Sequence, residues 1–214
     1  MKGLLVKDLR LLLQRKRFFL IMAVWALCMS FTMEDTGFVV GWVTMLMALF
    51  SLSTLSYDEY DNSMPFLMSM PVTSKEYAIE KYLFGMICGI VGCIFSITVE
   101  LISIYVKHIP VDIGVVLISC IIYIPLIMFM LAVCLPVEFK WGSDKGRTYM
   151  LLIYGIIFSA ILLVDKFFPE TANIVSVLDN VSNTAFTVFS TIFIVILFIA
   201  SILLSIRIMK KKEF

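Results

Sequence analysis

The sequence has little of the chemistry that a catalytic site or a metal centre needs. It contains one histidine, His108, and its five cysteines are spread singly through apolar stretches. No Ser, Cys or carboxylate motif surrounds His108 as in a catalytic triad, and no His or Cys spacing is that of a zinc site. We therefore expect neither intrinsic enzyme activity nor a bound metal.

Two further absences narrow the class of protein. No Gly-rich loop ends in Lys-Ser or Lys-Thr, so the chain should not bind and hydrolyse ATP by the P-loop mechanism. No polar stretch exceeds about thirty residues, which is below the roughly 50 residues that a separate soluble domain needs. The net charge of +1 gives no basic field for nucleic acid. Any ATP-driven work would need a partner subunit.

Apolar residues are abundant instead. They make up 61% of the 214 residues, more than one soluble core of this size can bury. The sequence predicts an all-α polytopic membrane protein with about six transmembrane helices in one domain, residues 1–214. The expected spans are 18–33, 38–56, 73–105, 113–134, 149–164 and 185–206.

The basic residues are sorted to one side of these spans. Of the 17 Lys and Arg residues, only Lys107 and Lys166 fall in segments on the opposite side. Because short loops rich in Lys and Arg stay in the cytoplasm, both termini are expected inside the cell and the number of spans should be even. The predicted location is the plasma membrane.

Residues 1–17 have the pattern of an interfacial helix. Lys7 and Arg10 lie towards one side of this helix, away from an apolar face. That face carries Leu5, Leu9, Leu12 and Leu13. We expect the helix to lie flat on the inner leaflet; the alternative is a simple basic anchor that precedes the first span.

The longest polar interruption, residues 57–76, lies on the basic side. Its acidic residues Asp58, Glu59 and Asp61 weaken the attraction to anionic lipid, which favours contact with a protein. A solvated loop is the alternative. Prolines break any continuous helix here, and a new helix is expected to begin at Thr73, because Glu76 completes a capping box.

The opposite side carries one long segment, residues 165–183. Its apolar residues are too numerous for a solvated loop, so short helices that dip back into the outer leaflet are expected before the last span. These residues are Ile174, Val175, Val177 and Leu178.

Within the spans, one carboxylate and three glycines stand out. Glu100 lies well inside the third span, where an ionisable group is a candidate for a transport pathway. The alternative is structural, with Glu100 reaching the headgroup region or Lys107. Gly85, Gly89 and Gly92 have the small-residue spacing that lets helices pack closely.

The organisation resembles the permease subunits of ABC-2 type transporters, particularly the small six-span kind of Gram-positive bacteria that exports phenol-soluble modulins or lantibiotics. The resemblance covers nearly the whole chain. Its carriers are the opening Met1-Lys2-Gly3-Leu4-Leu5-Val6-Lys7-Asp8-Leu9, the stretch from Tyr57-Asp58-Glu59 to Met70-Pro71-Val72-Thr73-Ser74-Lys75-Glu76, Lys81-Tyr82, and the outer segment before the last span.

The resemblance implies how such a subunit would work. The inner segment 57–76 would form a coupling helix seated in a groove of an ABC ATPase, and segment 165–183 would form the re-entrant helices. Residues implied to couple to the ATPase are Tyr57, Asp58, Glu59, Tyr60, Asp61, Asn62, Thr73, Lys75 and Glu76. A second inner-loop contact would involve Glu138, Lys140, Asp144 and Arg147.

The working unit implied is two permeases, as a homodimer or a pair with a related paralogue, and two ATPases that hold ATP and Mg. The chain itself would bind no cofactor and would form half of the pathway for a peptide or amphipathic compound. Two other classes stay open: an ATP-independent channel or carrier, and a membrane anchor that recruits a partner protein. The sequence does not name the cargo.

Overall fold

The computed structural model describes residues 2–32, 36–60, 63–69, 72–107, 113–167 and 183–212. Over these residues the chain is almost entirely α-helical, as expected. The helices are α1 (Lys2–Gln14), α2 (Lys16–Thr32), α3 (Thr36–Tyr60), α4 (Ser63–Ser69), α5 (Ser74–Lys107), α6 (Ile113–Trp141), α7 (Ser143–Phe167) and α9 (Asn183–Lys211).

Four helices are long and apolar enough to cross a membrane, as judged over the described residues. The candidate spans are Phe38–Glu59 in α3, Ser74–Lys107 in α5, Tyr123–Trp141 in α6 and Phe189–Lys211 in α9. The chain is therefore a multi-pass membrane protein. Helices α2 and α7 occupy the sequence positions of the first and fifth expected spans, and the total of six stays a prediction.

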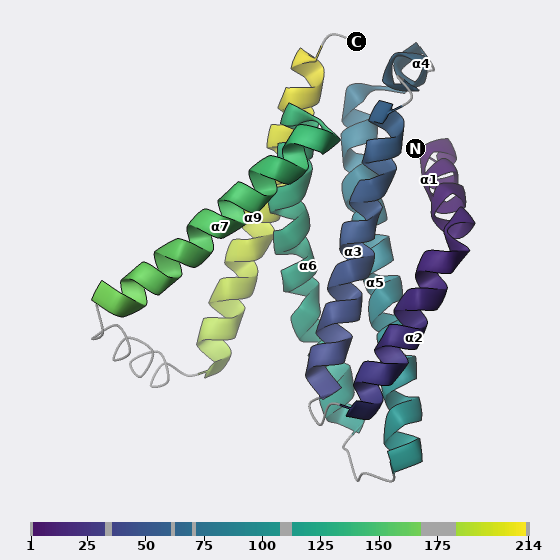
Figure 1. Cartoon of the computed structure of the whole chain (residues 1–214). Coiled ribbons are helices and arrows are strands. Elements are labelled where there is room, and N and C mark those ends of the chain that lie inside the picture. Colours follow the sequence, from purple (N-terminus) through teal and green to yellow (C-terminus); the bar gives the residue numbers. More distant parts are fainter. Residues whose placement is uncertain are drawn as a thin grey trace.

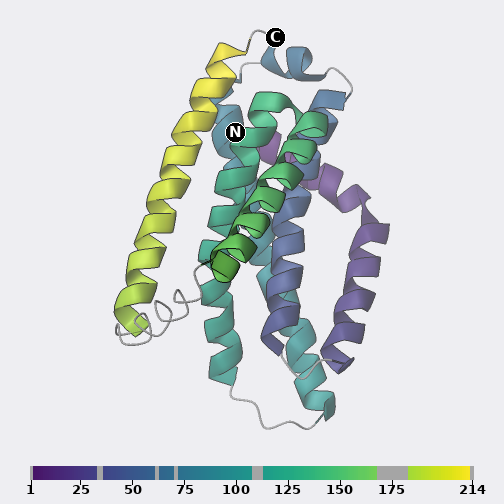
Figure 2. The same ribbon diagram turned by 60° about the vertical axis from the view of Figure 1, so that its left-hand side comes forward.

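The long helices form an elongated bundle with both termini at one end (Figures 1 and 2). We call this the terminal end; the short helix α4 lies there too. Helices α3 and α5 make the most extensive contact, and α6 joins α3 to α9. Helix α7 leaves the terminal end and diverges from the rest of the bundle.

Three glycines of α5 lie against neighbouring helices. A Cβ at Gly85 would lie 2.7 Å from Leu131 of α6, and one at Gly92 would lie 2.6 Å from Met47 of α3. Gly89 faces α6 in the same way. A larger side chain at any of these positions would require its neighbours to shift, least easily at Gly92, where the nearest atom is the Met47 Cβ. These glycines therefore allow the close packing of α5.

The start of α5 has the expected capping box. The Glu76 carboxylate accepts a hydrogen bond from the Thr73 backbone N–H at 3.0 Å, and the Thr73 hydroxyl accepts one from the Glu76 N–H at 3.2 Å. These bonds satisfy two of the backbone donors that a helix start leaves without partners. The polar inner segment therefore leads directly into the longest membrane helix.

The fourth expected span ends later than predicted. Helix α6 runs through Pro136 to Trp141, whereas the sequence pattern placed its end at Cys134. Proline removes one backbone donor but does not end a helix whose surroundings satisfy the freed carbonyl. Gly142 then adopts a φ of +79°, a conformation that glycine tolerates best, and α7 begins at the next residue.

The N-terminal helix packs against the bundle along one side. This side is formed by Leu4, Asp8 and Leu12, whereas Leu9 and Leu13 are 48% and 57% exposed. The predicted leucine face is therefore split: Leu9 and Leu13 point away from the protein and Leu12 packs against it, and the interfacial position of the helix stays a prediction. The pattern could not show this, because the protein-facing stripe contains a charged residue, Asp8.

The predicted re-entrant segment falls mostly outside the described residues. Helix α7 continues to Phe167, beyond the expected end of the fifth span at Val164. The description resumes at Asn183 with α9. Re-entrant helices over 165–183 therefore stay a prediction.

Candidate functional site

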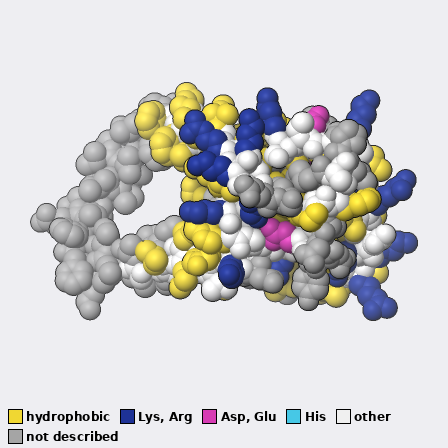
Figure 3. Space-filling model, turned by 90° about the horizontal axis from the view of Figure 1, so that it is seen from above, with side chains coloured by type: hydrophobic (Ala, Val, Ile, Leu, Met, Phe, Trp, Pro, Cys, Tyr) yellow, Lys and Arg dark blue, Asp and Glu magenta, His cyan; other side chains and the backbone are white. Residues whose placement is uncertain are grey.

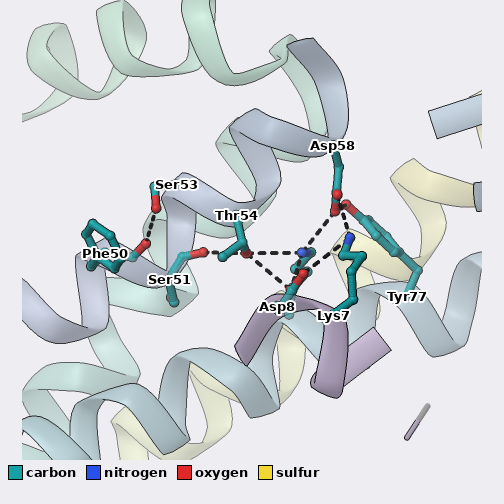
Figure 4. A network of polar contacts seen from close by, with 9 residues as sticks. Lys7, Asp8, Phe50, Ser51, Ser53, Thr54, Asp58 and Tyr77 are labelled. Atoms are coloured by element: carbon teal, nitrogen blue, oxygen red, sulfur yellow. Dashed lines mark hydrogen bonds and ion pairs between the residues drawn. The ribbon is translucent and has the colours of Figure 1, made fainter. Parts of the chain in front are cut away.

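A buried ion network joins three helices near the terminal end (Figure 4). Its centre is Lys81 of α5, whose side chain is 2% exposed. The Lys81 ammonium group pairs with Asp8 of α1 and, at 3.0 Å, with Asp58 of α3. A cation on one helix thus holds carboxylates on two others.

Further side chains contact these carboxylates. The Lys7 ammonium group pairs with Asp58 and lies 3.2 Å from Asp8. The Tyr77 hydroxyl donates to Asp58 at 2.9 Å, and the Thr54 hydroxyl donates to Asp8 at 3.2 Å. The charges of two lysines and two aspartates therefore compensate one another. Hydroxyl groups donate further hydrogen bonds to the two carboxylates.

This arrangement makes α1, α3 and α5 act as one unit at the terminal end. Removing one partner from a buried ion pair leaves an uncompensated charge and typically costs about 3–5 kcal/mol. The network therefore resists separation of these helices. We call the set Lys7, Asp8, Asp58 and Lys81 the ion clamp.

One more carboxylate lies beside the ion clamp. Glu80 of α5 is completely buried, and neither of its carboxylate oxygens has a hydrogen-bond partner among the described residues. The ammonium groups of Lys81 and Lys7 attract its carboxylate, and the carboxylates of Asp8 and Asp58 repel it. The cluster thus holds more acceptors than donors, a feature that the sequence pattern did not indicate.

A second contact joins the end of α3 to the start of α7. The Glu59 carboxylate at the end of α3 accepts a hydrogen bond from the Ser143 N–H at 2.5 Å, in the first turn of α7. Its other oxygen lies 3.7 Å from the Lys212 ammonium group. Because a carboxylate at a helix N-terminus offsets the positive end of the helix dipole, Glu59 caps α7 from another helix.

The helix α4 occupies the middle of the predicted coupling segment. Met64 and Leu67 are buried against the bundle, while Pro65 and Phe66 are exposed, Phe66 by 64%. The sequence pattern indicated no helix here because of the prolines. Pro65 lies in the first turn, where its missing N–H has no intrahelical partner to lose.

The structure places the predicted coupling residues in different environments. Asp58 is 4% exposed, so its carboxylate faces the ion clamp and not a partner surface; the acidic cluster is thus not wholly a surface feature. Tyr57 is half-buried beneath the Arg15 guanidinium, 4.9 Å from the ring centre. Lys75 is exposed. Outside the described residues lie Asp61, Asn62 and the side chain of Tyr60.

The residues of the predicted second inner-loop contact also lie in different environments. Glu138 is 2% exposed, which removes its side chain from any partner. Lys140 lies over the Trp141 ring at 4.4 Å, and Arg147 donates to the Ser56 hydroxyl at 3.0 Å. Asp144 belongs to the first turn of α7, with its side chain outside the described part.

Among the side chains that the structure describes, Lys and Arg outnumber Asp and Glu on the face of the terminal end. Figure 3 looks onto this end and shows Lys and Arg side chains at several places on the face, with fewer Asp and Glu. This agrees with the sorting of charge in the sequence. The aspartates of the ion clamp contribute little to this surface because they are buried.

At the opposite end, Glu100 joins α5 to α2. Its carboxylate accepts a hydrogen bond from the Ser30 hydroxyl at 3.2 Å. Lys107 and Ser103 both donate to the Ser30 carbonyl, at 2.7 and 3.0 Å. These contacts connect Glu100 to α2, and both its place in a transport pathway and the structural alternative stay predictions.

Among the described residues, no group of three His, Cys, Asp or Glu side chains is placed to hold a metal ion. The candidate site consists of an exposed short helix, α4, connected on both sides to helices that the ion clamp holds together.

Comparisons with known proteins agree with this organisation. The model of the family described as ABC-2 family transporter protein matches residues 3–210. No curated protein and no solved structure matches the chain. Because the match covers nearly the whole sequence, including the ion clamp, α4 and every candidate span, the chain belongs to the ABC-2 family of transporter proteins.

Proposed function

We propose that the chain is the permease subunit of an ATP-driven ABC exporter in a bacterial plasma membrane. It would form half of the translocation pathway for a peptide or amphipathic compound. Membership of the ABC-2 family supports a permease component that works with an ABC ATPase. ATP and Mg would be held by the partner, with a second permease completing the pathway.

The observation that carries the coupling proposal is the exposed helix α4 at the basic terminal end. Phe66 projects from it with 64% of its surface exposed, while Met64 and Leu67 anchor it to the bundle. An exposed aromatic on a short, anchored helix suits a groove on another protein, because such side chains supply most of the energy at interfaces. The charge sorting supports an inner position for this end.

The connections of α4 suggest how force would travel. Helices α3 and α5 flank α4 in the chain, and the ion clamp binds them to each other and to α1. When ATP binding closes the ATPase dimer, displacement of α4 would therefore move three helices together. The two states of the ATPase must contact α4 differently for this coupling to work.

The test is recovery of a partner with the tagged protein from its native membrane in a mild detergent. Mass spectrometry should find a stoichiometric protein with a phosphate-binding loop. Phe66→Ser should reduce its recovery about tenfold, as expected when an interface loses one well-packed aromatic. The matched control is Phe31→Ser, since Phe31 is also exposed but lies near the opposite end of α2.

The outcomes separate the proposal from its alternatives, provided that all variants insert in equal amounts. Recovery of the ATPase with Phe31→Ser but not with Phe66→Ser supports coupling through α4. Equal recovery with both variants removes α4 from the interface. A partner without a phosphate-binding loop favours a membrane anchor. Absence of any partner, with activity lost in Glu100→Gln, favours a channel or carrier.

A further inference from the structure

The side of α1 that faces away from the bundle contains a hollow that shares only Lys7 with the ion clamp. Its volume is about 300 Å³. The lining combines charged and amide groups with aliphatic side chains, all from one helix. The lining residues are Gly3, Val6, Lys7, Arg10, Leu11 and Gln14. We call this the α1 hollow.

An apolar strip runs beside the α1 hollow. Val6, Leu9 and Leu13 are each about half exposed, whereas Leu4 and Leu12 on the other side of α1 are buried against the bundle. Because α1 leads directly into the apolar helix α2, this strip lies at the border of the membrane. Acyl chains are the apolar surface available to cover it.

The charges of the α1 hollow favour an anion. Lys7 is already paired with Asp58 and Asp8, but Arg10 is exposed and has no ion-pair partner within the described part of the chain. A guanidinium group presents paired N–H donors that fit the oxygens of a phosphate. A basic group next to an apolar strip matches the two parts of a phospholipid.

We propose that the α1 hollow binds the headgroup of an anionic phospholipid. The phosphate contacts Arg10 and Lys7, and the acyl chains follow the strip formed by Val6, Leu9 and Leu13. The Lys7 ammonium group has three N–H donors, so it holds the headgroup while it stays paired with Asp58. The lipid thereby extends the ion clamp to the membrane surface. This site is independent of the ATPase.

The absence of a side chain at Gly3 provides a sharp test. A Cβ placed there would meet nothing within 4 Å, so the fold accommodates Gly3→Leu, and the new side chain occupies the hollow without changing any charge. Gly155 in α7 is open in the same way, which makes Gly155→Leu the matched control. For charge, Arg10→Gln is compared with Lys75→Gln, because Lys75 is exposed at the same end.

The experiment uses the full chain in nanodiscs of equimolar phosphatidylglycerol and phosphatidylcholine. Native mass spectrometry measures which lipid stays bound after release from the disc. The wild-type chain should retain phosphatidylglycerol preferentially. Arg10→Gln and Gly3→Leu should each reduce this preference about tenfold, since one charge-assisted contact is lost or blocked. Lys75→Gln and Gly155→Leu should retain it.

Three results would overturn the proposal. An equal loss in Lys75→Gln and Arg10→Gln would mean that lipid responds only to the general basic field. Unchanged retention in Gly3→Leu would mean that the hollow is not the site. Displacement of the lipid by millimolar inorganic phosphate would identify the ligand as a free anion. Retention that follows the expected pattern and resists phosphate supports the lipid site.

Discussion

Two sides of the bundle differ sharply in the fraction of their residues that is buried. One side is formed by α3 and α5, and the other by α9. In the most apolar stretch of α3, 56% of the residues are buried, and in that of α5 44% are buried. In that of α9 only 11% are buried. The first side thus supplies its own packing surface. The second depends on what surrounds the chain, either lipid or the second permease of the proposed unit.

The two sides also differ in the kind of contact that holds them. The α3 and α5 side is joined by the ion clamp, in which charges on three helices compensate one another. Helix α9 is held by neutral groups: the Tyr82 hydroxyl lies 2.6 and 2.8 Å from the Ser201 and Ser205 hydroxyls. Ser201 also donates to the Ala132 carbonyl. Loss of one of these neutral hydrogen bonds should therefore cost less than loss of one partner from the ion clamp.

The largest difference should appear when the ion clamp is broken. Lys81→Met leaves two buried aspartates facing Lys7 alone, and we expect a loss of about 3–5 kcal/mol in the free energy of unfolding. Lys75→Met, on the exposed part of the same helix, should change it by less than about 0.5 kcal/mol. Denaturant titration of the purified variants in detergent measures both. Equal stability would mean that the clamp contributes nothing.

A smaller effect separates the two sides by packing alone. Leu55→Ala removes a side chain that is 0% exposed in α3, and should destabilise the protein by about 2–5 kcal/mol. Leu203→Ala makes the same change in α9, where the side chain is 58% exposed; its effect should stay below about 0.5 kcal/mol. A comparable loss at Leu203 would show that α9 is buried by a stable partner.

The smallest expected effect concerns the contact between the end of α3 and the start of α7. Glu59→Gln weakens the charge that caps α7, which should cost about 1 kcal/mol and raise amide exchange in the first turn of α7 about fivefold. Hydrogen exchange with mass spectrometry reads this locally. Glu76→Gln is the control, since it should loosen the first turn of α5 only. Faster exchange in α7 with the control would indicate a general loss of stability.

Much of the fold follows from the long apolar runs, because a run of this length in a membrane forms an α-helix. The start of α5 was predictable from the spacing of Thr73 and Glu76, and the sequence spacing also singled out the close approach at Gly85 and Gly92. The residue pattern did not predict α4, since Pro65 indicates a break unless one knows that it falls in the first turn. Only the resemblance implied a helix within residues 57–76.

The ion clamp could not be predicted for a different reason. Asp8, Asp58 and Lys81 lie far apart in the sequence, and only the packing of three helices brings them together. Each has the appearance of an ordinary interfacial charge when considered alone. The burial of Asp58 thus altered the interpretation of the acidic cluster, whereas the neighbouring Glu59 stayed partly accessible and took a capping role.

The length of α5 determines how far a tilt at the terminal end displaces the opposite end of the bundle. Its 34 residues correspond to about 51 Å at about 1.5 Å per residue, compared with about 30 Å for the hydrocarbon core of a bilayer. In a straight helix of this length, a small tilt at one end produces a large displacement at the other. If the terminal end is held by a partner and the helix tilts by about 10°, the far end, where Glu100 and Lys107 contact Ser30, travels about 9 Å.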